Sequence, residues 1–282
     1  MEYTVFKARL IEKLSELTDP DEEISVSTVT KNNGITLEVI SIHSPGRGIC
    51  PTINIREIKA GFDDGMTLPH LAKEVLSLCR EKSFPEEAFR MELEDYENFR
   101  DKICFRAVNS AKNKELLEDV PFYPVLDLAL VFYYRANPAE GLTGTVLVRN
   151  DDLVRWGITC EEIADDAFRN TPELEPVHFL TLSEYPPDGK IHILTNENRI
   201  YGASVMFYKN VCENLSSKYK RDLYILPSSI HEVLALPVSG NHCLEDLKEM
   251  VFEVNRAVLE ETEVLSDEVY RWSRVSGTLE LA

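Results

Sequence analysis

Ile24-Ser25-Val26-Ser27-Thr28-Val29-Thr30-Lys31-Asn32-Asn33-Gly34-Ile35-Thr36-Leu37-Glu38-Val39-Ile40-Ser41-Ile42 is the stretch that decides the fold class. Its two arms, 24–30 and 35–42, are rich in β-branched residues, which favour an extended backbone. The arms are joined through Asn33-Gly34, a dipeptide that tolerates the positive φ angles of a tight turn. The stretch therefore predicts an antiparallel β-hairpin, the clearest one in the chain.

Apolar residues at helical spacing lie on both sides of this hairpin. Before it, the apolar positions from Val5 to Leu17 recur at helical intervals until Asp19-Pro20, which predicts a first helix. After it, we expect a third strand over 52–58 and then a helix over 68–79, whose apolar stripe covers the hairpin sheet. The first part of the chain therefore predicts a small sheet packed against helices.

Short strands and helices follow one another irregularly in the rest of the chain. A capping-box spacing at Ser83-Phe84-Pro85-Glu86 predicts a helix continuing towards Asn98, so a domain boundary is expected between 82 and 100. An apolar segment lies at 103–108, and strands are expected at 125–134, 144–149, 177–182, 191–194, 203–208, 223–226, 233–236 and, as a closing edge strand, 269–272. Helices are expected at 111–117, from a cap at Asp151 to Gly157, from a capping box at Thr159 to a stop before Pro172, at 210–219 and at 244–258.

Clustered strands of this kind predict an α+β fold with mainly antiparallel sheets covered by helices. A length of 282 residues allows one large domain or two modest ones. We favour two, an N-terminal domain over 1–95 with the hairpin sheet and its covering helix, and a larger C-terminal α+β domain over 96–282.

The chain is strongly acidic. It carries 49 acidic and 30 basic residues, a formal net charge of −19. Nucleic acid and membrane surfaces are poor partners for such a protein, because binding either normally relies on clustered Lys and Arg. The acidity indicates either solubility or, as an alternative function, mimicry of nucleic acid towards a basic partner.

The compartment that we expect is the cytoplasm. The N-terminus Met1 to Lys7 lacks the basic and apolar regions of a signal peptide, and no apolar run approaches the roughly 20 residues of a membrane helix. The six cysteines are widely separated and are expected to be reduced, small buried side chains without disulfides.

Pro227-Ser228-Ser229-Ile230-His231-Glu232 is the segment most suggestive of chemistry. A hydrolase needs a hydroxyl, an imidazole and a carboxylate in one hydrogen-bonded series, which makes Ser229 the candidate nucleophile and His231 the candidate base. Neighbours in an extended chain point to opposite faces, so Glu232 diverges from His231 and an acid from elsewhere, such as Asp222 or Glu253, is required. The alternative is a polar corner whose side chains satisfy turn backbone groups.

Metal and cofactor motifs fail by at least one residue. His231-Glu232-Val233-Leu234-Ala235 begins like the zinc-protease motif but has Ala235 at the second ligand. His242-Cys243 has no companion pair, although His178 and His192 would be able to join it through folding. Pro45-Gly46-Arg47-Gly48 lacks the further residues of a phosphate-binding loop. We therefore expect no metal and no cofactor.

Several segments resemble one family. They are Thr28 to Gly34, Val108 to Lys114, Leu126 to Ala129, Ile193 to Asn196, Tyr201 to Ala203, Tyr224 to Val233, Glu249 to Asn255 and Leu265 to Tyr270. Together these segments resemble an uncharacterised domain-of-unknown-function family of clostridial, gut-associated bacteria. The resemblance implies a bacterial intracellular protein and supplies no catalytic residue.

These patterns favour a non-catalytic interaction or ligand-binding module whose partner is an unknown protein or small molecule. A small-substrate hydrolase that uses Ser229 and His231 is the alternative, and an acidic nucleic-acid mimic is another. Neither the activity nor the oligomeric state follows from the sequence.

Overall fold

The computed structural model describes residues 1–46, 50–82, 95–139, 142–182, 191–239 and 243–282. The strand pairings in this part are mostly antiparallel and helices accompany each sheet, so the expected α+β class is confirmed. The chain divides into two compact units. The first contains the described residues of 1–31, 35–94 and 137–144, and the second those of 32–34, 95–136 and 145–282.

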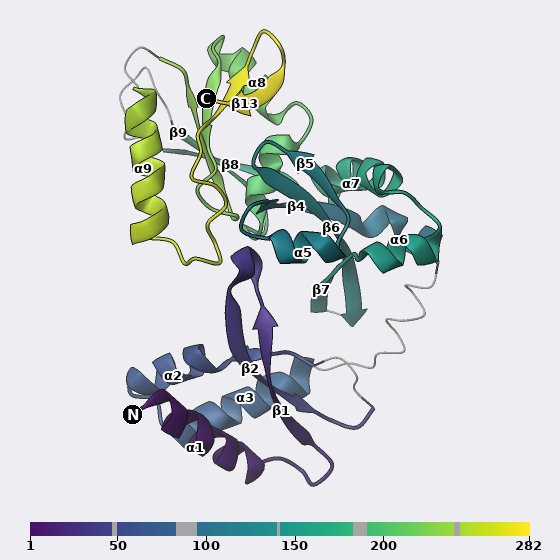
Figure 1. Cartoon of the computed structure of the whole chain (residues 1–282), viewed down its shortest axis with the longest axis vertical. Helices are drawn as coiled ribbons and strands as arrows, with labels where there is room; N and C mark the ends of the chain where they lie inside the picture. Colours follow the sequence, from purple (N-terminus) through teal and green to yellow (C-terminus); the bar gives the residue numbers. More distant parts are fainter. Residues whose placement is uncertain (47–49, 83–94, 140–141, 183–190, 240–242) are drawn as a thin grey trace. The chain divides into compact units, whose positions relative to one another are not determined.

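The first unit is a three-stranded sheet in the order β1-β2-β3, accompanied by helices (Figure 1). Its elements are α1 (Tyr3–Ser15), β1 (Glu23–Thr30), β2 (Thr36–His43), β3 (Ile53–Asn54), α2 (Ile55–Asp63) and α3 (Leu68–Lys82). Phe6, Leu10 and Leu14 of α1 are fully buried with Ile40 and Ile42 of β2. The unit therefore has a hydrophobic core of its own.

The predicted hairpin and both predicted helices of this unit are present. Asn33 and Gly34 have φ angles of 62° and 70°, the positive values that the Asn-Gly turn was expected to supply. The strand predicted over 52–58 is wrong, because only Ile53–Asn54 is extended and α2 begins at Ile55. The Asn54 side chain accepts a hydrogen bond from the N–H of Arg56 and so caps this helix. The helix predicted from Ser83 lies largely outside the described residues.

The second unit contains two sheets (Figure 1). One has strand order β4-β6-β5 with β7 also on β6, and its strands are β4 (Ile103–Asn109), β5 (Phe122–Val125), β6 (Leu128–Ala139) and β7 (Leu142–Leu147). The other has order β13-β12-β10-β11-β9-β8, with β8 (Val177–Leu182), β9 (Ile191–Asn196), β10 (Leu223–Leu226), β11 (Val233–Pro237), β12 (Tyr270–Ser273) and β13 (Thr278–Leu281). The helices are α5 (Lys114–Asp119), α6 (Asn150–Trp156), α7 (Cys160–Leu174), α8 (Val211–Tyr219) and α9 (Leu244–Ala257), with the 3-10 segment η4 (Gly202–Phe207).

Four predictions for this unit are corrected. The strand expected at 203–208 is instead the 3-10 segment η4. Because its residues are buried almost throughout, the sequence shows no alternation of apolar and polar residues that would distinguish a strand from a helix. The helix expected to stop before Pro172 runs to Leu174, because proline removes only one bond from its last turn. The helix expected to be capped by Asp151 begins at Asn150 after Arg149. The strand at 270–273 is not an edge, because β13 pairs outside it.

Helices pack against both sheets of the second unit. Leu247 and Val251 of α9 form one cluster with Leu226 and Leu236 of β10 and β11. Strand β4, at the end of its sheet, is covered by side chains that bond its outer backbone. The N–H of Phe105 donates to Thr171 Oγ1, and the N–H of Ala107 donates to Ser204 Oγ, both at 3.0 Å. This edge is therefore closed by polar side chains.

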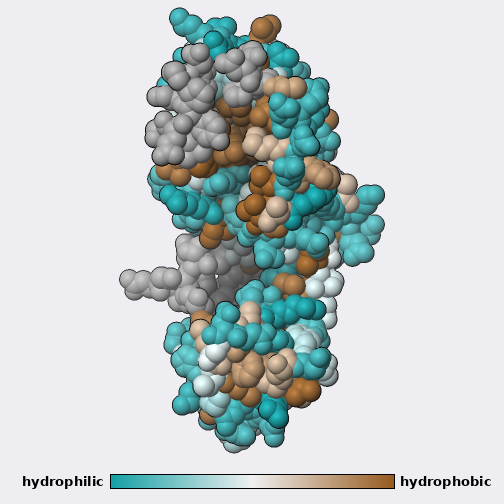
Figure 2. Space-filling view, turned by 90° about the vertical axis from the view of Figure 1, so that its left-hand side faces the viewer, coloured by the Kyte–Doolittle hydropathy of each residue, from teal (hydrophilic) through white to brown (hydrophobic). Residues whose placement is uncertain are grey.

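Hydrophilic and hydrophobic residues both reach the described surface, and Val154, Val258 and Val275 are among the exposed hydrophobic residues. On the face seen in Figure 2, hydrophilic residues predominate and hydrophobic residues gather in separate groups. Among the described residues, no helix is both long enough and apolar enough to cross a membrane. All six cysteines are free thiols. Cys79, Cys104 and Cys212 are buried as expected, but the prediction is wrong for Cys243, which is exposed, and for Cys50 and Cys160, which are only partly buried.

Glu22 provides a pH-dependent test of the first unit. Its carboxylate accepts hydrogen bonds from Arg80 Nε at 2.9 Å and Nη2 at 2.7 Å, and these bonds lower the pKa of Glu22 from 4.5 to about 2. Because the pKa is depressed in the folded state, the stabilisation is complete above about pH 4.5 and is lost as the pH falls towards 2. We expect Glu22→Gln to lower the free energy of unfolding at neutral pH by about 1–3 kcal/mol.

Urea unfolding at a series of pH values measures this effect. The difference between wild type and Glu22→Gln should shrink from about pH 4.5 downward. Glu16→Gln is the matched control, because the side chain of Glu16 is 55% exposed and its ion pair with Lys13 is on the surface. A difference that stays constant over the whole series would contradict the assignment.

Candidate functional site

The segment that contains the predicted site residues connects β10 to β11 and is held by a second segment. Ser229 forms an isolated antiparallel bridge with Val264. The N–H of Ile230 donates to the carbonyl of Glu263 at 2.8 Å, and the N–H of Leu265 donates to the carbonyl of Ser228 at 2.9 Å. Backbone hydrogen bonds to 263–265, a segment distant in the sequence, therefore fix the backbone of the predicted site.

Ser229 and His231 are brought close together, but their side chains bond to backbone groups. Ser229 Oγ accepts the backbone N–H of His231 at 3.0 Å. Nδ1 of His231 accepts the backbone N–H of Tyr201 at 3.3 Å. Among the described residues, no hydrogen bond joins the Ser229 hydroxyl to the imidazole. Both contacts are those expected of a polar corner that satisfies turn backbone.

The acid next to His231 is Glu263. His231 Nε2 and Glu263 Oε1 are 3.6 Å apart, and the two side chains are 33% and 38% exposed. Because Nδ1 accepts a hydrogen bond, the neutral imidazole carries its proton on Nε2, facing this carboxylate. Glu232 makes no side-chain hydrogen bond or ion pair with any described residue, and Asp222 is paired with Arg271 at 2.6 Å instead.

Gly202 makes the close approach that places Tyr201 beside His231. A Cβ atom at position 202 would lie 2.2 Å from Thr195 Oγ1, 2.5 Å from the carbonyl oxygen of His231 and 2.6 Å from the N of Asn196. The Thr195 hydroxyl also donates to that His231 carbonyl at 2.7 Å. Only glycine therefore lets the 201–202 backbone pack against β9 and the His231 turn.

Tyr201 adopts a backbone conformation that is uncommon for a large side chain. Its φ and ψ angles are 53° and 26°, in the left-handed region. The preceding turn is closed by Asn196, which accepts from the N–H of Ile200 at 3.2 Å and donates to its carbonyl at 2.9 Å. The strain at Tyr201 is therefore held by the surrounding structure, a feature that is frequent at functional sites.

Arg106 lies against the Tyr201 ring. Its guanidinium carbon is 4.3 Å from the centroid of Tyr201 and 5.6 Å from that of Tyr133 on β6. Nε of Arg106 is buried and has no hydrogen-bond partner among the described residues. Arg106 also forms no ion pair with any described residue. A cation therefore rests on aromatic rings without an anion of its own.

The Tyr133 hydroxyl is bonded to a carboxylate. The Tyr133 hydroxyl donates to Glu175 Oε1 at 2.6 Å, and Asn196 Nδ2 donates to Glu175 Oε2 at 3.1 Å. Burial raises the pKa of Tyr133, and the charge of Glu175 raises it further. Burial also raises the pKa of the Cys104 thiol to about 12. Both groups therefore stay protonated at neutral pH, and neither supplies an anionic nucleophile.

We call Arg106, Tyr201, His231 and Glu263 the Arg106 cluster. It offers a guanidinium, an aromatic face, an imidazole donor and a carboxylate, which suits the binding of a polar ligand more than nucleophilic catalysis. The sequence did not point to it, because Arg106 lies inside the segment 103–108, whose other residues are apolar. The available signal was that single charge within 103–108.

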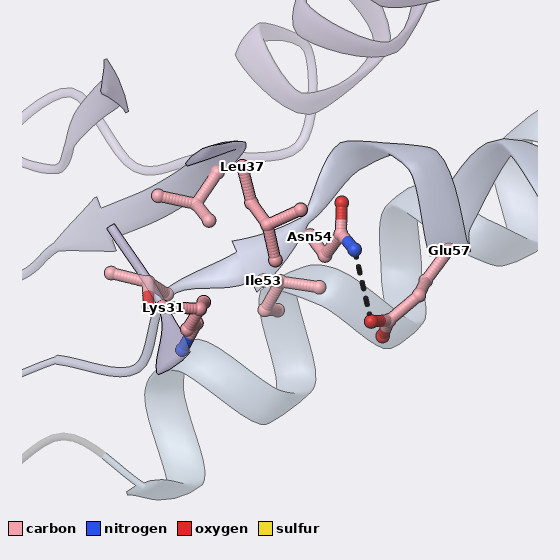
Figure 3. A pocket seen from close by; sticks show the side chains of 7 residues that line it. Lys31, Leu37, Ile53, Asn54 and Glu57 are labelled. Carbon is pink, nitrogen blue, oxygen red and sulfur yellow. Dashed lines mark hydrogen bonds between the residues drawn. The ribbon is translucent and has the colours of Figure 1, made fainter. Parts of the chain in front are cut away.

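The first unit has a separate hollow, with a volume of about 280 Å³ (Figure 3). Lys31, Leu37, Ile53, Asn54 and Glu57 are among its lining residues. Asn54 Nδ2 donates to Glu57 Oε1 at 3.0 Å, so two of its polar groups bond to each other. The hollow is therefore a weaker candidate than the Arg106 cluster.

The remaining sequence candidates occupy structural positions. His192 is buried, with Nε2 2.7 Å from the Tyr219 hydroxyl and Nδ1 3.1 Å from Thr181 Oγ1. Cys243 Sγ donates to Glu245 Oε2 at 2.9 Å, whereas its neighbour His242 lies outside the described residues. The loop at 45–48 is described only up to Gly46. Within the described ranges, no three His, Cys, Asp or Glu side chains converge as metal ligands.

Comparison with known proteins gives one result. A family model with the description "Family of unknown function (DUF5688)" matches residues 3–274. No curated protein and no solved structure matches the chain.

The glycine at 202 gives a direct test of this geometry. We expect Gly202→Ala to lower the free energy of unfolding by about 3 kcal/mol, because the new methyl group meets backbone atoms that have no room to move. Gly61→Ala in α2 is the control, since its nearest neighbours are the flexible ends of Leu71 at 3.3 Å and Met66 at 3.4 Å. Denaturant titration of both variants measures the difference. Equal midpoints for wild type and Gly202→Ala would show that the close approach is not real.

Proposed function

We propose that this chain, which belongs to the family of unknown function DUF5688, is a non-catalytic protein that binds a small oxyanion at Arg106. The ligand group is a carboxylate or a phosphate. The observation that carries the proposal is the buried Nε of Arg106, which lacks a hydrogen-bond partner in the described structure.

The energetic argument starts from that nitrogen. A buried donor without a partner costs about 1–3 kcal/mol, and more when the group is charged. Buried polar groups in proteins nearly always have partners, so an orphaned donor calls for a bound species that supplies an acceptor. An oxyanion supplies acceptor oxygens and negative charge together, and it would offset both costs.

The aromatic rings explain why the acceptor is an oxyanion. Contact with Tyr201 at 4.3 Å uses the face of the guanidinium, so its hydrogen bonds are made along the N–H edge. That edge matches the two oxygens of a carboxylate or phosphate, which it binds through parallel hydrogen bonds. The chain has a formal net charge of −19, so most of its surface repels anions. Arg106, which forms no ion pair with a described residue, is therefore the group that attracts one.

The alternative functions receive less support. A hydrolase requires His231 to accept the proton of Ser229, whereas the Ser229 hydroxyl accepts a backbone N–H and the imidazole Nδ1 accepts another. Mimicry of nucleic acid rests on the net charge alone. The bacterial cytoplasm, and a clostridial, gut-associated source, are further parts of our proposal and rest on the composition and the sequence resemblance.

Thermal unfolding with added inorganic phosphate or citrate tests the proposal. A ligand that binds only the folded protein stabilises it by about 2.7 kcal/mol at one hundred times its Kd. We expect one or both anions to raise the Tm of the wild type, with sodium chloride at equal ionic strength as the blank. The anion that acts shows whether the site prefers carboxylate or phosphate.

Variants identify the residue responsible. Arg106→Gln should abolish the shift in Tm, and Arg106→Lys should reduce it, because lysine keeps the charge but loses the planar donor fork. Arg155→Gln is the matched control, since Arg155 is 55% exposed and pairs with Asp152 on the surface of α6. Equal shifts in wild type and Arg106→Gln, or no shift in wild type with either anion, would refute the proposal.

A further inference from the structure

Among the described residues, nothing pairs with the outer edge of β1, the outer strand of the first unit. In the order β1-β2-β3, β1 pairs with β2 from Glu23 opposite His43 to Thr30 opposite Thr36. No other backbone hydrogen bond involves 23–30 in the described structure. One whole side of this strand therefore presents unpaired main-chain donors and acceptors.

The hairpin fixes which residues face outward. The N–H of Lys31 donates to the carbonyl of Ile35 at 2.7 Å, so the odd-numbered residues of β1 bond to β2. The N–H and C=O groups of Ile24, Val26, Thr28 and Thr30 point to the free side.

This edge lacks the devices that normally block pairing. Residues 24–30 contain no charge and no proline, and the pairing with β2 is continuous, without a bulge. The side chain of Val26 is 38% exposed on it. Strand β4 of the second unit, by contrast, has its outer N–H groups bonded by Thr171 and Ser204. One edge is closed and the other is open.

We infer that β1 pairs antiparallel with β1 of a second copy of this chain. The outward-facing residues must lie opposite one another, which allows a two-fold axis at Ser27, with Ile24 opposite Thr30 and Val26 opposite Thr28. About eight backbone hydrogen bonds then join the copies. The resulting sheet has six strands, three from each copy.

The charges at the ends of β1 select this partner and this register. Glu23 and Lys31 make no side-chain ion pair with any described residue, and each is exposed. With the axis at Ser27, Glu23 of each copy lies opposite Lys31 of the other, giving two cross-strand pairs. A register shifted by two residues in either direction places Glu23 opposite Val29 or Asn33 and loses both pairs.

Cross-linking at the axis tests the pairing. The two Ser27 residues would form a non-hydrogen-bonded pair with Cα atoms about 4.5 Å apart, within the range of a disulfide. In a Cys243→Ser background, which removes the exposed native thiol, we expect Ser27→Cys to form a covalent dimer under mild oxidation. Ser25→Cys is the matched control, because it lies opposite Val29 and should cross-link several-fold less.

Sedimentation velocity of proteins without an introduced cysteine completes the test. We expect the wild type to sediment with twice the mass of one chain and Val26→Lys as a monomer, with unchanged circular dichroism. Equal cross-linking of Ser27→Cys and Ser25→Cys, or a monomeric wild type at every concentration, would overturn the inference. If Val26→Lys does not fold, the comparison of the two cysteine variants still decides. Binding of an unrelated extended peptide by a monomeric wild type would assign the edge to another protein.

Discussion

The guanidinium of Arg106 is the group on which our account of function depends. Arg106 is partly buried and its Nε is fully buried, and a buried donor without an acceptor costs free energy. Here the aromatic rings of Tyr133 and Tyr201 stabilise the face of the cation, while Nε has no acceptor in the described structure. In our proposal, this donor edge is where the ligand binds. An oxyanion is the ligand that we propose.

The parts around Arg106 serve to hold Tyr201 in place. Gly202 packs against Thr195 and the carbonyl of His231, and Asn196 closes the turn that leads to Tyr201. His231 in turn bonds the Tyr201 backbone, and its own segment is fixed by pairing with Val264 and its neighbours. The polar residues at 229–231 therefore shape and stabilise the site. Their hydrogen bonds go to backbone groups, and among the described residues none joins the Ser229 hydroxyl to the His231 imidazole.

Much of the fold follows from local sequence, because its signals are chemical and short in range. The Asn33-Gly34 turn, the apolar stripe of α3 and the Thr159 capping box each specify backbone geometry within a few residues, and all three are present. The wrong secondary-structure predictions occur where two local sequence signals disagree or where no signal is present. Ile53 to Ile58 contains β-branched residues, yet the cap at Asn54 starts a helix, and 203–207 is too uniformly buried for its period to be read.

The candidate site was less accessible to sequence reasoning. Ser229 and His231 were correctly placed in a corner between two strands, and the geometry of that corner follows from turn chemistry. Arg106, Tyr201 and Glu263 are separated by long stretches of chain, and only tertiary packing brings them to His231. A lone arginine in an apolar strand indicates an unusual environment, but it does not say which ring or anion will lie beside it.

The Nε–H resonance of Arg106 in a ¹⁵N-correlated NMR spectrum tests the central claim most directly. Loss of one signal in Arg106→Lys assigns that resonance. On addition of phosphate or citrate, we expect it to move downfield and its exchange with water to slow, as a new hydrogen bond to oxygen forms, while chloride at equal ionic strength leaves it unchanged. A resonance that responds alike to all three salts, or to none, would contradict an oxyanion site at Arg106.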